Sequence, residues 1–374
     1  MQKTLEIVIV AGGTGGHVIP GLAIAELLRQ QGVLVRWIGA VQGIENRLVP
    51  QAGLALEHIK IAGLRGKNIL TYVKFPFGLI RAVLQSCRSL KRTRPAAVLA
   101  MGGYVSGPVG LAARLCNIPL FLHEQNSIAG MTNRWLAPSA RIIFSGFPNS
   151  LSRFPQWQFI GNPLRAAIIS NLNSSPAKDQ QESTTNNSCE KLNRKLRILV
   201  IGGSLGAQAL NQCLPKALAS FAEQERPEVW HQSGANHIEQ CRTFYQEQNI
   251  APYRLDSFID DMAAAYTWAD VVVSRAGALT VSELAAAAKP SILVPFPHAV
   301  DDHQTANAQY LVNVGAALLL PQSQLDAQSL AKALQNLFDS QRLQRMSNAA
   351  RAALPHDAGP KMVTAILDSL KFND

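Results

Sequence analysis

The feature that most constrains the fold is an apolar run that leads into a glycine-rich turn and then a helical pattern, and that occurs twice. Residues 5–10 (LEIVIV) precede GGTGGH at Gly12–His17, and residues 196–201 (LRILVI) precede GGSLGA at Gly202–Ala207. Apolar runs that alternate with helical segments are typical of parallel sheets covered on both faces. The pattern predicts two doubly wound α/β domains. A ligand is then expected at the carboxyl ends of the strands, in the cleft between the domains.

Length and composition agree with two domains. The hydrophobic fraction of 47% excludes a disordered chain. A chain of 374 residues is longer than one hydrophobic core usually supports, so two domains are expected. Residues 166–195 are rich in Asn, Ser, Thr and Gln and are predicted to form a polar linker or insertion. The predicted domains are therefore residues 1–165 and 196–355, and the helical pattern of residues 356–374 is expected to pack back onto the first domain.

The net charge of +10 is unevenly distributed along the chain. Residues 1–165 carry +13, residues 166–195 carry +1, and residues 196–374 carry −4. A basic half is typical of proteins that meet nucleic acid, phosphorylated substrates or membranes. The sequence contains no recognisable nucleic-acid-binding module, so nucleic acid is not an expected partner.

The cysteines and the apolar segments limit where the protein acts. The five cysteines are widely spaced and form no Cys-x-x-Cys pair, which argues against a disulfide scaffold or a zinc site and favours a reducing compartment. The first ten residues (MQKTLEIVIV) do not resemble a signal peptide. The most apolar long stretch, residues 95–122, is interrupted by Gly, Pro and Arg114. Any membrane contact is therefore expected to be peripheral.

The glycine-rich turns exclude two nucleotide-binding motifs. The first turn has Val18 where a dinucleotide fingerprint needs glycine, and no acidic residue occurs at residues 39–43 to bind a ribose. Neither turn contains the Gly-Lys-Ser/Thr of a Walker motif. A third turn, residues 102–108 (GGYVSGP), also follows an apolar run. The turns are therefore suited to phosphate groups in general, and the alternative is that their glycines serve only tight strand–helix packing.

Several spaced motifs resemble those of one family. In chain order they are GGTGGH (12–17), GGYVSGP (102–108), HEQN (123–126), GNP-x-R (161–165), GGSLGA (202–207), FIDDM (258–262), SRAGALTVSE (274–283) and the PFPH, DDHQ and NA segments of 295–308. Together they resemble the MurG family of bacterial peptidoglycan glycosyltransferases. The resemblance implies the GT-B fold, in which two Rossmann-like domains face a central cleft. It also implies an inverting hexosyltransferase that moves GlcNAc from UDP-GlcNAc to the MurNAc 4-hydroxyl of undecaprenyl-pyrophosphoryl-MurNAc-pentapeptide, converting lipid I to lipid II.

The resemblance assigns the donor, UDP-GlcNAc, mainly to the second domain. Glu283 is expected at the start of a helix, where its carboxylate accepts the ribose hydroxyls, and Ser204 is expected to bind phosphate. The main chain of Ile259 is expected to read uracil, and Gln304 and Asn126 to bond the sugar. The full set of expected donor-binding residues is Thr14, Gly15, Gly16, Asn126, Arg165, Ser204, Ile259, Ala278, Leu279, Thr280, Val281, Ser282, Glu283 and Gln304.

The resemblance places the acceptor and the acid–base chemistry on the first domain. Inversion requires a base for the acceptor hydroxyl, and His17 is the candidate, because histidine titrates near neutral pH. Tyr104 and Glu124 are the further catalytic candidates, followed by His123 for positioning or proton relay. The acceptor pyrophosphate is expected at Gly13, Gly103 and Ser106. No Asp-x-Asp occurs in the motifs, so neither an essential metal nor another cofactor is predicted.

The basic first domain also contains an apolar segment surrounded by cations. A membrane-binding patch is predicted there, formed by Lys67, Lys74, Phe75, Phe77, Arg81 and Arg88. A core helix with a solvated charged face is the structural alternative. With the resemblance, the patch implies a peripheral protein on the cytoplasmic face of the bacterial inner membrane. The expected partners are UDP-GlcNAc, lipid I, anionic lipid and the cell-wall and division machinery.

Three other functions remain open at this point. One is another GT-B enzyme with a soluble substrate, such as a UDP-GlcNAc 2-epimerase or a macrolide-type glycosyltransferase, although HEQN and GGYVSGP argue against it. A second is a non-catalytic nucleotide-sugar-binding or scaffold protein, against which the presence of His17, Glu283 and Gln304 argues. The third, a nucleic-acid-binding role, fits only the charge.

Overall fold

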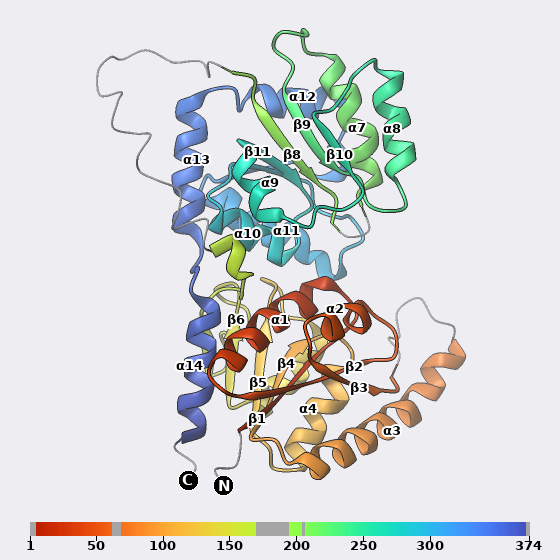
Figure 1. Cartoon of the computed structure of the whole chain (residues 1–374), viewed down its shortest axis with the longest axis vertical. Helices are drawn as coiled ribbons and strands as arrows, with labels where there is room; N and C mark the ends of the chain where they lie inside the picture. Colours follow the sequence, from red (N-terminus) through yellow and green to blue (C-terminus); the bar gives the residue numbers. More distant parts are fainter. Residues whose placement is uncertain (1–4, 62–68, 170–193, 204–205, 372–374) are drawn as a thin grey trace. The chain divides into compact units, whose positions relative to one another are not determined.

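The chain forms two α/β units. A computed structural model describes residues 5–61, 69–169, 194–203 and 206–371 (Figure 1). Contacts within the chain define one unit of residues 1–165 and 355–374 and another of residues 166–354. Each unit contains a sheet of parallel strands with helices packed against it. The predicted α/β class with two doubly wound sheets is thus confirmed. Most of the predicted linker, residues 170–193, lies outside the described residues.

The first unit has a seven-stranded parallel sheet in the order β3-β2-β1-β4-β5-β6-β7. Its strands are β1 (Glu6–Ala11), β2 (Leu34–Ala40), β3 (Ala55–Ile59), β4 (Ala97–Gly102), β5 (Leu120–Glu124), β6 (Ile142–Ser145) and β7 (Trp157–Phe159). Its helices are α1 (Gly15–Gln30), α2 (Glu45–Gln51), α3 (Ile69–Thr93), α4 (Ser106–Leu115), α5 (Met131–Leu136), the short 3-10 helix η1 (Ala137–Ser139) and α14 (Ala358–Lys371).

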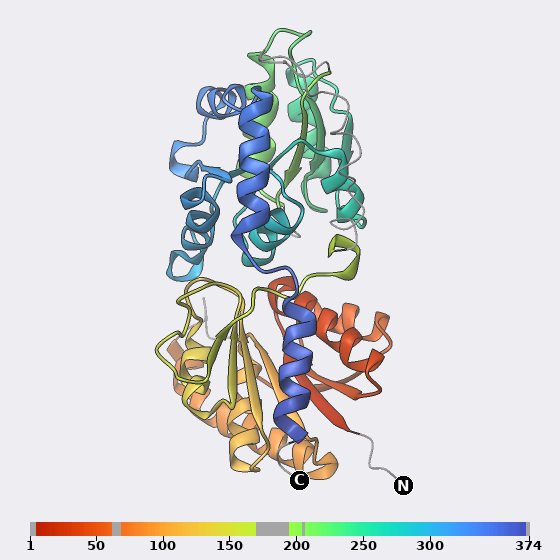
Figure 2. The ribbon, with the colours of Figure 1, turned by 90° about the vertical axis from the view of Figure 1, so that its left-hand side faces the viewer.

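The central strand β1 contributes to two cores on opposite faces of this sheet, because successive strand side chains point to opposite sides. Ile7 and Ile9 belong to the core that includes residues of α1 and α14. Val8 and Val10 belong to the core that includes residues of α3 and α4. Figure 2 shows α14 running along the first face. The two helices α1 and α14 are in contact, since a Cβ at Gly359 would lie 2.7 Å from a methyl carbon of Leu27.

The second unit has a six-stranded parallel sheet in the order β10-β9-β8-β11-β12-β13. Its strands are β8 (Arg197–Ile201), β9 (Glu228–Gln232), β10 (Arg254–Asp256), β11 (Val271–Ser274), β12 (Ser291–Leu293) and β13 (Ala317–Leu319). Its α-helices are α7 (Gln208–Ala219), α8 (Ile238–Glu247), α9 (Met262–Trp268), α10 (Ala278–Ala286), α11 (His303–Asn313), α12 (Ala327–Gln335) and α13 (Ser340–Ala353). The 3-10 helices are η2 (Val300–Asp302) and η3 (Gln322–Gln324).

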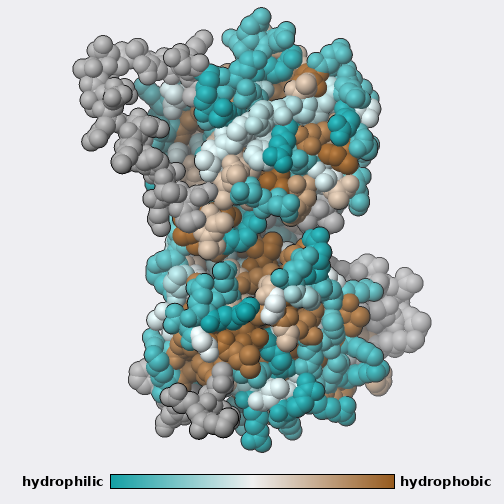
Figure 3. Space-filling model, in the orientation of Figure 1, coloured by the Kyte–Doolittle hydropathy of each residue, from teal (hydrophilic) through white to brown (hydrophobic). Residues whose placement is uncertain are grey.

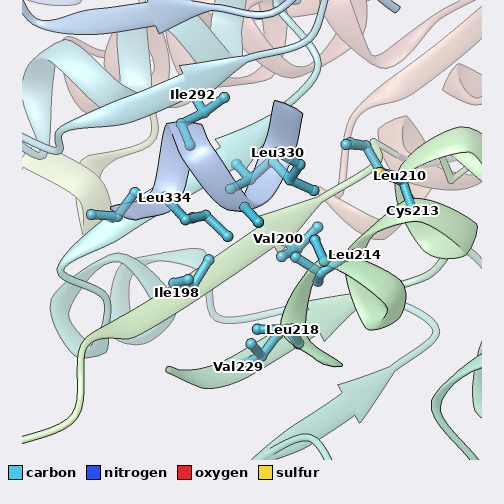
Figure 4. Close-up of a cluster of buried hydrophobic side chains, with 14 of the residues drawn as sticks. Ile198, Val200, Leu210, Cys213, Leu214, Leu218, Val229, Ile292, Leu330 and Leu334 are labelled. Carbon is cyan, nitrogen blue, oxygen red and sulfur yellow. The ribbon is translucent and has the colours of Figure 1, made fainter. Parts of the chain in front are cut away.

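The core of the second unit is centred on β8. Figure 4 shows Ile198 and Val200 of this strand against Leu214 of α7 and Leu330 and Leu334 of α12. Each fully buried aliphatic side chain of this kind contributes about 1.5–3 kcal/mol relative to an exposed one. This packing fixes β8 and α7, and thereby the ends of the glycine-rich turn between them.

The adjacent strands β1 and β4 of the first unit end in glycine-rich turns at the same edge of the sheet. Their pairing shifts register between Val10 and Ala11, so that Ala11 pairs with Gly102. Parallel neighbours necessarily bring their carboxyl ends to one edge. The turns after residues 11 and 102 are therefore side by side, although they are about ninety residues apart in sequence.

Candidate active site

The first turn places His17 at the carboxyl edge of the sheet. β1 ends at Ala11, and α1 begins at Gly15, so His17 lies in the first turn of α1. Thr14, with an exposed side chain, is the N-cap residue, and Gly15 and Gly16 open the helix. Gly13 has a φ of 93°, a left-handed conformation that glycine adopts without steric cost.

The His17 imidazole contacts the ends of two other strands. Its Nδ1 lies 3.1 Å from the main-chain oxygen of Met101 and 3.1 Å from Oε1 of Gln125. Gly102 has a φ of 105°, and a Cβ there would lie 2.7 Å from the same Nδ1. Only glycine at residue 102 avoids a steric clash with the imidazole in this position. Gln125 lies inside the HEQN motif, but no local sequence pattern indicates that it contacts His17.

A buried carboxylate that the motifs did not single out supports the first turn. Glu45 is fully buried, and its Oε2 and Oε1 accept from the main-chain N–H groups of Gly13 at 3.0 Å and Ala40 at 3.1 Å. A Cβ at Gly12 or Gly43 would collide with this carboxylate. The glycines at residues 12, 39 and 43 all lie against Glu45 in the structure. They are separated in the sequence, so no local pattern shows that they surround one side chain.

The turn after β4 is closed by its own side chains. The Ser106 hydroxyl is fully buried, donates to the Gly102 oxygen at 2.7 Å and accepts from the Gly102 N–H at 3.2 Å. Gly103 has a φ of 81°, and a Cβ there would collide with the main-chain oxygen of Gly12. The N–H of Gly13 is donated to Glu45. Among the three residues expected at the acceptor pyrophosphate, the Gly13 N–H and the Ser106 hydroxyl thus already bond within the chain.

Tyr104 lies half-buried on the same turn. Its hydroxyl donates to the main-chain oxygen of Gln42 at 3.1 Å. Burial raises the pKa of the phenol, and the negative charge of Glu45 raises it further. Tyr104 therefore keeps its proton at neutral pH, which suits a hydrogen-bond donor better than a base.

Glu124 and His123 end strand β5, and both are buried. Glu124 Oε1 accepts from the Asn126 N–H at 3.0 Å and its side-chain amide at 3.3 Å, while Oε2 accepts from the Gly130 N–H at 2.9 Å and Asn133 Nδ2 at 2.8 Å. Glu124 thus organises the loop that contains the half-buried Asn126. Burial lowers the pKa of His123 to about 4, so this imidazole is neutral at pH 7.

In the second unit, the start of α10 follows the carboxyl end of β11. Ala278, Leu279 and Thr280 form the first turn, whose N–H groups carry the positive end of the helix dipole. Val281 and Ser282 are buried, and the Ser282 hydroxyl donates to the Ala278 oxygen at 3.0 Å. The side chains of Val281 and Ser282 therefore pack inside the second unit and support the helix.

Glu283 lies further along this helix than the sequence suggested. It is the sixth residue of α10, not its first, because the helix already begins at Ala278. Its side chain is 9% exposed, and Oε2 accepts from the Tyr266 hydroxyl of α9 at 2.9 Å. Tyr266 carried no motif and was missed.

Gln304, in the first turn of α11, links two loops. Its Oε1 accepts from the N–H groups of Ala276 at 3.2 Å and Phe296 at 2.9 Å. These loops follow β11 and β12, so the side chain holds the carboxyl ends of two adjacent strands together. The orientation that these bonds require leaves its amide nitrogen for other partners.

The remaining predicted donor residues are more scattered. Ile259 is 4% exposed in the loop between β10 and α9. Arg165 is half-buried and is the last residue of the first unit's main segment, residues 1–165. Ser204 lies outside the described residues. Gly206, two residues further on, has a φ of 78°, and a Cβ there would collide with the main-chain oxygen of Ser233.

The predicted membrane patch lies on α3. Phe77 is 76% exposed, and Arg81 and Arg88 are also exposed, whereas Phe75 is half-buried. A shallow groove of about 440 Å³ is lined by Lys60, Phe77, Ile80, Arg81, Leu84, Gln85 and Arg88. Lys67 lies outside the described residues, and the side chain of Lys74 is not described. On the face drawn in Figure 3, hydrophobic residues of this unit reach the surface among hydrophilic ones.

The described part of the chain contains no group of three or more His, Cys, Asp or Glu side chains arranged to hold a metal ion. No helix within these residues is sufficiently long and apolar to cross a bilayer.

Comparisons with known proteins agree with both units. Residues 7–145 match the glycosyltransferase family 28 N-terminal domain, and residues 197–358 match the glycosyltransferase family 28 C-terminal domain. The UDP-N-acetylglucosamine–N-acetylmuramyl-(pentapeptide) pyrophosphoryl-undecaprenol N-acetylglucosamine transferase of Chromohalobacter salexigens is 47% identical over 98% of both chains. The crystal structure of Acinetobacter baumannii MurG matches with a TM-score of 0.80 at 36% identity, covering 97% of this chain and 99% of that one.

A putative-epimerase structure shares only the architecture. The crystal structure of a putative UDP-N-acetylglucosamine 2-epimerase from Listeria monocytogenes covers 100% of this chain and 98% of its own, with a TM-score of 0.67 at 15% identity. Such low identity shows the GT-B fold alone, whereas the Chromohalobacter salexigens relative is 47% identical over nearly the whole chain. The chain belongs to glycosyltransferase family 28 and, within it, to the MurG family.

Proposed function

We propose that the protein transfers GlcNAc from UDP-GlcNAc to the MurNAc 4-hydroxyl of undecaprenyl-pyrophosphoryl-MurNAc-pentapeptide, with inversion at the anomeric carbon. The observation that carries this proposal is the 47% identity over 98% of a relative whose name states this donor and acceptor. A 2-epimerase activity is less well supported, since the epimerase structure is only 15% identical.

The second unit binds the donor in this proposal. The first turn of α10, at Ala278–Thr280, offers N–H groups to anionic or polar atoms. Glu283 accepts the ribose hydroxyls, the main chain of Ile259 reads uracil, and Gln304 donates to the sugar through its amide nitrogen. Ser204 binds the phosphates, and Arg165, at the end of the first unit's main segment, contributes to donor binding.

The first unit binds the acceptor and provides the base. His17 takes the proton of the MurNAc 4-hydroxyl as its oxygen bonds to the anomeric carbon and UDP leaves with the electron pair. The N-termini of α1 and α4 attract the acceptor pyrophosphate. Gly13, Gly103 and Ser106 shape these turns. Tyr104 and Glu124 support the acceptor region, and Asn126, with Thr14, Gly15 and Gly16, completes the sugar contacts. The motifs contain no Asp-x-Asp, and the proposed reaction uses no metal.

We further propose that α3 binds anionic lipid, which keeps the enzyme peripheral on the cytoplasmic face of the inner membrane. Exposed Phe77 beside Arg81 and Arg88 supports this assignment. The lipid tail of the acceptor stays in the bilayer, so the enzyme has to reach it there. Contact with the cell-wall and division machinery would follow from the same location.

One assay tests the function and the base together. UDP release from UDP-GlcNAc should depend on a lipid I analogue, and the product should contain GlcNAc linked to MurNAc. His17→Ala should lower kcat by roughly 10²–10⁴ while UDP-GlcNAc still binds. Acceptor-independent epimerisation would disprove the transferase proposal, and near-normal turnover of the variant would remove His17 from the role of base.

A further inference from the structure

The two hydrogen-bond partners of His17 Nδ1 are both oxygen atoms. The Met101 main-chain oxygen can only accept a hydrogen bond. The Gln125 amide has a defined orientation, because its Nε2 donates to that same Met101 oxygen at 2.6 Å. An amide turned the other way would place two acceptors against each other. Oε1 of Gln125 therefore faces His17 Nδ1, at 3.1 Å.

This arrangement determines which imidazole nitrogen carries the proton. Nδ1 lies between two acceptors, at 3.1 Å from each, so it has to be the N–H nitrogen. In a neutral imidazole the lone pair is then on Nε2. A general base needs that lone pair, and Nε2 is the nitrogen not used by these contacts.

The position of Gln125 is itself determined by the fold. Its side chain is 1% exposed, it directly follows β5, and its main-chain oxygen accepts from Asn162 Nδ2 at 3.1 Å. A Cβ at Gly102 would lie 2.7 Å from His17 Nδ1 and 3.5 Å from Gln125 Oε1. The contact between the imidazole and the amide thus depends on glycine at residue 102.

We propose that Gln125 is a positioning residue for the transfer reaction, which holds His17 as the Nδ1–H tautomer and directs the Nε2 lone pair to the acceptor hydroxyl. This inference rests on the proposed role of His17 as the base. Gln125 acts through His17 and is not itself assigned a contact with substrate. Its neutral amide orients the imidazole without adding a negative charge that would favour the imidazolium.

Ionisable groups that interact with His17 or lie near the turn before it come from three other elements. His123 on β5 interacts with it electrostatically. Glu45 of α2 bonds to the turn before α1, and Tyr104 lies on the turn before α4. A pH profile therefore has to be compared between variants in which these three groups are unchanged.

The tautomer is measured directly by ¹⁵N NMR of the imidazole in the full-length protein. We expect a protonated Nδ1 and an unprotonated Nε2 for the neutral imidazole of the wild type. A spectrum with the proton on Nε2 would overturn the proposal without any variant. Gln125→Met removes one of the two acceptors but keeps a similar length, so it should raise the share of the Nε2–H tautomer, while the Met101 oxygen still favours Nδ1–H.

The kinetic test is a double-mutant cycle between residues 125 and 17. Gln125→Met should lower kcat about 10-fold, the lower range for a residue that orients a ligand or base, and leave the KM for UDP-GlcNAc unchanged. In the His17→Ala background it should have no further effect on kcat. An additive loss would overturn the proposal, since it would indicate a role independent of His17. Gln30→Met, at an exposed residue at the end of α1, is the matched control and should keep wild-type kcat.

Gln125→Glu provides a conservative variant with a different signature. One carboxylate oxygen can still accept from Nδ1–H, although the other faces the Met101 oxygen without a hydrogen to donate, and the negative charge favours the imidazolium. The acidic limb of the kcat–pH profile should therefore move to higher pH, whereas an unmoved limb would contradict the contact. If His17→Ala retains wild-type kcat, the base assignment fails, while the NMR result still reports on the Gln125 contact.

Discussion

At the scale of single residues, the fold orients the carboxylate of Glu283, for which we propose a role in ribose binding. The side chain is 9% exposed, and one oxygen is held by Tyr266 from the neighbouring helix α9. A carboxylate oriented in this way binds hydroxyl groups with little loss of side-chain entropy.

Glu283→Gln should raise the KM for UDP-GlcNAc by roughly 10–100-fold, because hydrogen bonds to a charged group contribute about 1.5–3 kcal/mol. Initial rates at varied UDP-GlcNAc give this number. Glu239→Gln, on the surface of α8, is the control. An unchanged KM would rule out the ribose assignment.

Glu45 is a structural counterpart in the first unit, since it accepts two main-chain N–H groups at the turn before α1. Glu45→Ala leaves both without their acceptor and should lower the free energy of unfolding by about 2–4 kcal/mol. Urea unfolding at pH 7 measures the loss, and the exposed Glu26→Ala should cost far less. Equal stability of the two variants would show that the turn does not depend on this carboxylate.

At the scale of elements, α3 packs one face against the core of the first unit and exposes another face to solvent. Ala82 and Leu90 are fully buried in the core, while Phe77, Ile80 and Leu84 are more than half exposed. A helix that was only part of the core would place these three apolar side chains inside, so the exposed face favours contact with an apolar or interfacial environment.

Replacing Arg81 and Arg88 by Ser should weaken binding to anionic vesicles by roughly 10–30-fold, since each basic residue near such a surface contributes about 1 kcal/mol. Vesicle sedimentation at fixed salt measures this change. The variant Arg242→Ser/Arg345→Ser removes two exposed arginines from the second unit and should bind like the wild type. Equal loss in both variants would indicate only a dependence on net charge.

At the scale of the whole molecule, each unit contains a buried histidine that is neutral in the folded state. Burial lowers the pKa of His231 to about 3 and that of His123 to about 4. His231 is held by Tyr245 and Asn211, both at 3.0 Å. Unfolding releases each imidazole to its ordinary pKa of about 6.5, so the unfolded chain binds more protons below that pH.

The corresponding stability is therefore complete above about pH 6.5 and is lost as the pH falls toward 4 and 3. Between pH 7 and pH 5 each of these histidines should lower the free energy of unfolding by about 2 kcal/mol. Urea unfolding at the two pH values measures the difference. His231→Gln should reduce this pH dependence, whereas the exposed His58→Gln should preserve it, and identical slopes would contradict the assignment.

The sequence was most informative where the chain is completely buried. The apolar runs that precede the three glycine-rich turns are the strands β1, β8 and β4, because central parallel strands are continuous apolar runs. The edge strands β3, β7, β10 and β13 were not anticipated. Each has only three to five residues, and the first three include polar side chains, so local pattern does not separate them from loops.

By itself, the sequence determined the α/β class, the two sheets and the glycine-rich turns that follow their central strands, since these depend on local periodicity and on backbone conformations near glycine. Only the tertiary structure decided that Gln125 orients His17, that Glu45 supports the Gly13 turn and that Tyr266 holds Glu283. These pairs are 108, 32 and 17 residues apart in the chain. Strand order and helix packing bring them within hydrogen-bonding distance, and no local sequence pattern encodes that proximity.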